Sequence, residues 1–203
     1  MSSRSQLSLT VPRPPHVPRS LLNDFARYWR TMAVDFAHKA RTGFGKKSAL
    51  RNLKLRMSRK LIFVSGLLSC FSCQLGLAQA AGRAGCPGRD EACVACLRAF
   101  MHLRPLDTFA HTALGLANKD PENEKKILRA AADALTAYDE FLQILSDKAS
   151  RGHLEALAPE AVDSDSLFGQ GRQISHRFQA AIDSFFFDGD PELGKLTRHY
   201  GVF

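Results

Sequence analysis

The sequence lacks the features that would define an enzyme or a β-fold. No segment alternates apolar and polar residues over the length of a strand, and β-branched residues do not cluster. There is no P-loop or G-x-S-x-G motif, and Gly169 and Gly171 lack the third glycine and the preceding strand of a dinucleotide site. Histidines with the paired spacing of a metal site are also missing. We therefore predict an all-α protein, with no catalytic residue and no cofactor.

Acidic residues are nearly absent from the first 80 positions. There, 14 Lys and Arg accompany only Asp24 and Asp35, which gives a net charge of +12. Residues 81–203 hold 14 basic and 18 acidic residues, a net charge of −4. The overall charge of +8 thus belongs to the N-terminal part and not to the part expected to form the folded domain. This distribution argues against nucleic acid as a partner.

Residues 1–56 form a basic leader, for which two interpretations stay open. Four prolines in residues 1–20 predict disorder, and apolar residues at helical spacing predict one helix over residues 21–39. The leader is then a basic amphipathic arm, in the cytoplasm or on anionic lipid. Alternatively, translation begins at Met57, because Met57-Ser-Arg-Lys has the layout of a start followed by a charged n-region.

Charge is missing altogether from the 22 residues between Leu61 and Gly82. Residues 57–80 therefore read as a signal peptide, cut after Ala78-Gln79-Ala80 so that Ala81 becomes the first residue. The same stretch is long enough for a retained signal-anchor, with membrane contact through residues 61–82. A third interpretation is a lipoprotein, because Leu67-Leu68-Ser69-Cys70 resembles a bacterial lipobox in which Cys70 would be lipidated.

All three fates place residues 81–203 outside the cytoplasmic membrane. We expect this part to be periplasmic or secreted, or held outside by an anchor. It is predicted to be a small antiparallel bundle of about four main helices. The expected helices cover residues 91–103, 107–118, 120–148 and 172–187, with a short final helix from residue 192. The chain is expected to turn after Arg151-Gly152.

Three cysteines survive such a cleavage, Cys86, Cys93 and Cys96, and several roles are open for them. In an oxidising compartment, Cys93 and Cys96 could pair, or Cys86 could pair with either one. One thiol is left over in each case. Alternatively, the C-x2-C pair is a redox site, or a metal site with His102 as a further donor.

These observations predict a non-enzymatic binding or adaptor module for another protein or a component of the cell envelope. Aromatic side chains near the C-terminus are the candidate anchors, with ordinary core packing as the alternative: Phe185, Phe186, Phe187, Tyr200 and Phe203. Two further functions are possible. One is a thiol redox or metal-handling protein based on Cys86, Cys93 and Cys96, and the other is a two-sided membrane component that retains residues 1–80.

Overall fold

The computed structural model describes residues 16–41, 47–77 and 89–200 and confirms the all-α prediction, since these residues contain no strand. The finer expectation of a bundle of about four main helices in residues 81–203 is not confirmed; the described part of the chain forms nine α-helices, six of them within residues 89–200. They are α1 (Arg19–Arg41), α2 (Ser48–Lys54), α3 (Lys60–Leu75), α4 (Arg89–Met101), α5 (Pro105–Lys119), α6 (Glu124–Ser146), α7 (Lys148–Ala156), α8 (Ser166–Ser184) and α9 (Pro191–Tyr200). Three tighter or wider helical turns join them, η1 (Leu55–Arg59), η3 (Pro159–Ser164) and η4 (Phe185–Gly189).

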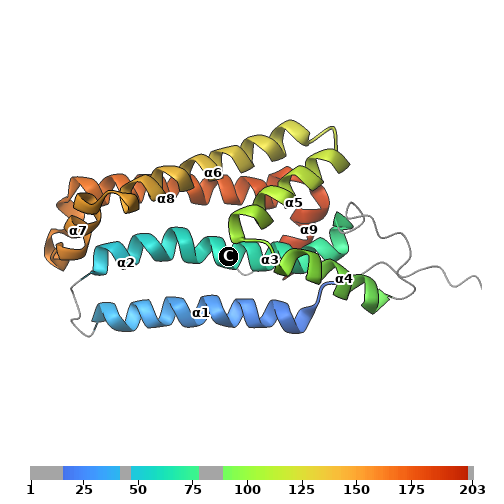
Figure 1. Cartoon of the computed structure of the whole chain (residues 1–203), viewed down its shortest axis with the longest axis horizontal. Coiled ribbons are helices and arrows are strands. Elements are labelled where there is room, and N and C mark those ends of the chain that lie inside the picture. The colour runs from blue at the N-terminus through green and yellow to red at the C-terminus, as the bar shows by residue number, and fades with distance from the viewer. Residues whose placement is uncertain (1–15, 42–46, 78–88, 201–203) are drawn as a thin grey trace, which may run out of the picture.

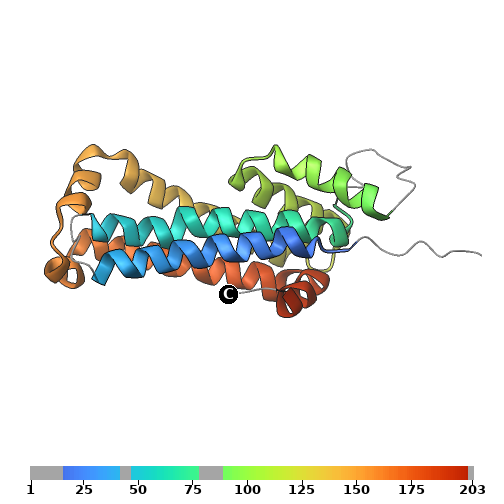
Figure 2. The ribbon, with the colours of Figure 1, turned by 90° about the horizontal axis from the view of Figure 1, so that it is seen from below.

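The long helices lie in layers along the longest axis of the molecule. In Figure 1, α1 forms the lower edge, α2 and α3 run above it as one line through η1, and α6 and α8 lie above these. Seen from below, α1 still runs beside α2 and α3, as Figure 2 shows. The shorter helices α4 and α5 cover one end, where both pack on α3. The line formed by α2, η1 and α3 is therefore the centre of the fold.

The segment that reads as an export signal forms this central helix. Twelve of the sixteen residues of α3 are buried, and α3 packs against α1, α4, α5 and α9. Its side chains are apolar almost all round, which is the pattern of a helix buried on every side. This composition is typical both of a helix in a protein core and of an export signal, so the sequence alone does not distinguish the two. Within the described ranges, no helix is both long enough and apolar enough to cross a membrane.

Helix α1 confirms the helix expected over residues 21–39 and packs closely on α3. A glycine, Gly66, makes the approach possible: a methyl group at this position would overlap the ring of Phe25. One turn away, the rings of Trp29 and Phe63 stack with their centroids 5.4 Å apart. The helix from the basic leader is thus part of the core packing.

The second half of the chain follows the expected helices with two differences. Residues 148–156 form α7 where a turn was expected, because the Asp147 side chain accepts hydrogen bonds from the amides of Ala149 and Ser150. Helix α8 starts six residues before the expected Arg172. Asp165 caps it through the Phe168 amide at 2.7 Å, and Gly171 faces Leu53, where a methyl group would come within 2.6 Å of the leucine.

Candidate functional site

Four cysteines from two helices come together between α3 and α4. Each helix carries a C-x2-C pair, and residues three apart lie on the same face of a helix. The pair on α3 is Cys70 and Cys73, and the pair on α4 is Cys93 and Cys96. All four side chains are buried, with exposed fractions of 0% to 5%. The contact between the helices is therefore lined by sulfur.

The two helices are joined most closely at Cys73 and Cys93. Their Sγ atoms are 3.3 Å apart, and the Cys73 thiol also donates to the backbone oxygen of Cys93 at 3.6 Å. The Sγ atom of Cys96 lies 3.1 Å from the hydroxyl oxygen of Ser72. On its other side, the Cys93 thiol donates to the backbone oxygen of His16 at 3.7 Å. Polar partners thus hold three of the four thiols in place.

The surroundings favour the protonated form of the two thiols on α3. Burial raises the pKa of Cys70 to about 12, with a smaller contribution from Cys93. Hydrogen bonding with Cys96, followed by burial, raises the pKa of Cys73 far above its ordinary value of 9.0. A thiolate in this core would lose its hydration without gaining an opposite charge. At neutral pH Cys70 and Cys73 are therefore neutral thiols.

The cysteine pairing expected from the sequence differs from the observed arrangement. Cys93 lies against Cys73, a residue of the predicted signal segment, and there is no disulfide among the four described cysteines. Cys86 lies outside the described residues. The three candidate metal ligands, Cys93, Cys96 and His102, do not come together, since both thiols are buried and His102 is exposed. In the described ranges, no three His, Cys, Asp or Glu side chains are placed to hold a metal ion.

The residues proposed for processing fall in two places. Ala78, Ala80 and Ala81 lie outside the described residues, so the cleavage site stays a prediction from the sequence. The lipobox cysteine, Cys70, is fully buried in the middle of the core. An acyl chain on its sulfur would not fit this packing.

Two of the aromatic interface candidates are corrected by the structure. Phe185 and Phe186 are fully buried, and the Phe185 ring packs 4.8 Å from that of Phe109, so neither can anchor a partner at the surface. Phe187 and Tyr200 are half-buried, each with an arginine over its ring. Phe203 lies outside the described residues. The sequence pattern misled here because a face of phenylalanines at helical spacing is equally typical of a core.

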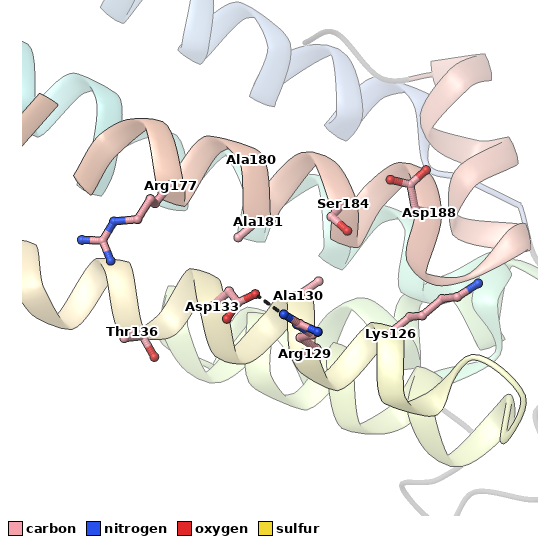
Figure 3. Close-up of a pocket in the computed structure, with 10 residues that line it drawn as sticks. All are labelled: Lys126, Arg129, Ala130, Asp133, Thr136, Arg177, Ala180, Ala181, Ser184 and Asp188. Atoms are coloured by element: carbon pink, nitrogen blue, oxygen red, sulfur yellow. Dashed lines mark ion pairs between the residues drawn. The ribbon is translucent and has the colours of Figure 1, made fainter. Parts of the chain in front are cut away.

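A surface groove of about 550 Å³ runs between α6 and α8. Figure 3 shows small side chains on its floor and charged ones along its rim. The rim arginines already have acidic partners: Arg129 lies 4.0 Å from Asp133, and Arg177 binds Glu140 through two hydrogen bonds. The groove therefore has mixed and largely compensated charge, which does not specify a class of ligand.

The residues that sequence reasoning missed are Cys70 and Cys73. Their spacing repeats that of Cys93 and Cys96, and two C-x2-C pairs on consecutive helical segments are a usable signal. It was hidden because both residues were assigned to a segment expected to be removed. Comparisons with models of protein families, with curated proteins and with solved structures give no match.

Proposed function

We propose that this is a thiol redox protein in which Cys73 and Cys93 cycle between two thiols and one disulfide. The observation that carries the proposal is the 3.3 Å distance between their Sγ atoms, across the contact of two helices that each present a C-x2-C pair. A disulfide bond is about 2.05 Å long. The two sulfurs therefore need to approach by little more than 1 Å to form the bond.

The oxidant that the proposal requires is a low-molecular-weight disulfide. One protein thiol, as the thiolate, attacks a sulfur of this disulfide, forming a mixed disulfide and releasing one small thiol. The second protein thiol then attacks the mixed disulfide and releases the second small thiol. Cys73 and Cys93 lose two protons and two electrons in total, and the small disulfide takes them up and is reduced to two thiols.

Burial makes this chemistry conditional on movement of α4. The raised pKa of Cys73 leaves very little thiolate at neutral pH, and both sulfurs are shielded from a reagent in water. Helix α4 packs mainly on α3, so its contact is the one that can open without unfolding the rest. We expect slow oxidation of the closed protein and faster oxidation whenever α4 separates from α3. Once formed, the disulfide ties α4 to α3.

The thiol proposal and the cleavage prediction exclude each other. Cleavage after Ala80 would remove Cys70 and Cys73, whereas the proposed pair requires α3 to remain. Export, an outer location and a partner protein remain predictions from the sequence alone. N-terminal sequencing of the protein from its native host separates the cases. A chain that begins at Ala81 would overturn the thiol proposal.

The test is to treat the full chain with an excess of oxidised glutathione and to map the disulfides by mass spectrometry. We expect one bond, linking the peptides that contain Cys73 and Cys93, and its reversal by dithiothreitol. Cys73→Ala and Cys93→Ala should each abolish it, while Cys70→Ala serves as the matched control and should keep it. A bond between Cys93 and Cys96, or an oxidised protein with no bond at Cys73, would contradict the proposal.

A further inference from the structure

Helix α1 presents a basic stripe to solvent on the side opposite the core. Successive residues of a helix are rotated by about 100°. On this basis Arg19, Arg30 and Arg41, each eleven residues apart, fall within about 40° of one another, and Arg27 lies about 40° beyond. All four are exposed. The core-facing Phe25 and Trp29 lie on the opposite side and are half-buried.

This stripe lies along an edge of the molecule. In both views of the ribbon, α1 runs beside α2 and α3, and its main contacts are with α2, η1 and α3. At its N-terminal end the Arg19 guanidinium also lies over the Tyr200 ring of α9, 5.9 Å from the ring centroid. With 23 residues it is about 35 Å long. Both acids of α1 lie on the flank of the stripe, where Asp35 pairs with Lys39 at 2.7 Å and Asp24 lies 3.8 Å from Arg27. Five basic residues against two acids still give α1 a net charge of +3, so its exposed face is a straight band with an excess of positive charge.

We propose that the basic stripe of α1, formed by Arg19, Arg27, Arg30 and Arg41, docks the protein on a membrane surface that contains anionic phospholipid. The first argument is complementarity of charge, because an arginine that lies within a Debye length of an anionic membrane surface is attracted to it. This proposal is independent of the thiol chemistry, since none of its residues belongs to the cysteine cluster.

The shape of the stripe and its apolar side chain favour a membrane over nucleic acid. A straight band along an edge of the molecule matches a planar surface. Val34 lies among the arginines and is 60% exposed. An apolar side chain at that place has no partner on a phosphate backbone, but it can enter the headgroup region of a bilayer.

The test uses the full reduced chain and sedimentation with vesicles of phosphatidylcholine, alone or with one-third phosphatidylglycerol. We expect binding to the anionic vesicles only, and its loss in 1 M salt, where the Debye length falls to about 3 Å. The variant Arg27→Gln/Arg30→Gln/Arg41→Gln should bind on the order of 100-fold more weakly, at about fivefold for each arginine.

The matched control removes the same charge from the opposite layer, by Lys125→Gln/Lys126→Gln/Arg129→Gln on α6. It should keep nearly the whole affinity of the unchanged protein. Thermal unfolding of both variants checks that the fold is retained. Three outcomes would overturn the proposal: equal losses in the two variants, equal binding to neutral vesicles, or tighter binding to duplex DNA at the same phosphate concentration.

Discussion

The N-terminal and C-terminal parts of the molecule are stabilised in different ways. Helices α1, α2 and α3 have no acidic residue in their first turns, and α2 begins after Lys47 without a side-chain cap. Lys47 itself has a left-handed backbone, with φ at 71°. In the C-terminal part, Asp147, Asp165 and Asp190 each accept a hydrogen bond from a backbone amide near a helix start. The first part thus depends on burial, and the second adds local capping.

This difference explains where the sequence is informative. A capping aspartate acts within three residues of its own position, so it is visible as a local pattern. The burial of α3 depends on four other helices, three of which follow it in the chain. Those contacts cannot be predicted from the sequence of residues 57–80 alone. A segment held only by its neighbours is therefore easily mistaken for one that leaves the fold.

The largest expected effect comes from removing α3. We predict that residues 81–203 alone do not fold, because α4, α5 and α9 would expose the faces that they pack on it. In the full chain, Phe71→Ala should lower the free energy of unfolding by about 3–5 kcal/mol, since this ring is fully buried. Urea unfolding followed by circular dichroism measures the change.

The control for the core substitution is Leu114→Ala on α5, where the side chain is 57% exposed. It should change the free energy of unfolding by less than about 0.5 kcal/mol. A cooperative thermal transition for residues 81–203 alone would contradict the central role of α3. It would instead support an independent domain behind a removable signal.

The same distinction between local capping and burial by distant helices decides which parts of the fold the sequence predicts. The helix after Asp120-Pro121, expected over residues 120–148, is α6, because its capping and its apolar periodicity agree. Helix α8 is capped by Asp165 and includes Gly171, whose place inside the helix is explained by packing against Leu53, a contact 118 positions away in the chain. The cysteine cluster was missed for the same reason. Its two halves are joined by tertiary contact and separated by residues 78–88.

A second prediction concerns alkaline pH and the buried thiol of Cys70. Below pH 9.0 the thiol is protonated in both states. Above this value the unfolded chain loses the proton, whereas the folded protein keeps it up to a pKa of about 12. The Cys70 thiol should therefore lower the free energy of unfolding by about 1.4 kcal/mol per pH unit in that window, or about 2 kcal/mol between pH 9 and 10.5, and the buried Cys73 thiol adds to this fall.

This dependence is measured by urea unfolding under reducing conditions at several pH values. Cys70→Ala should make the alkaline slope shallower by about 1.4 kcal/mol per pH unit, because only the contribution of Cys73 then remains. Ser69→Ala, one position earlier, is the control and should keep the full slope. An unchanged slope in Cys70→Ala would mean that this thiol does not sense the dry core.

A smaller effect is expected where α1 meets α3. In Gly66→Ala the new methyl group overlaps the Phe25 ring, so we expect a net loss of about 1–2 kcal/mol despite the higher helix propensity of alanine. Gly169→Ala on α8 is the matched control, because nothing lies within 4 Å of the added atom. It should stabilise the protein by about 0.5–1 kcal/mol. If both changes stabilise, α1 does not approach α3 as closely as described.

The smallest effect tests the capping side of the comparison at Asp165. Its carboxylate accepts from the Phe168 amide at 2.7 Å and lies 2.6 Å from a ring nitrogen of His153, and these two contacts lower its pKa below 3.8. Stability from a lowered carboxyl pKa is present above pH 3.8 and is lost as the pH falls below it. Asp165→Ala should therefore cost about 1 kcal/mol near neutral pH, and this cost should shrink as the pH falls further below 3.8. Asp163→Ala, two positions earlier and 92% exposed, should cost less than about 0.3 kcal/mol, because an exposed ion pair contributes little. Equal losses for both aspartates at neutral pH would show that general charge, and not the local cap, starts α8.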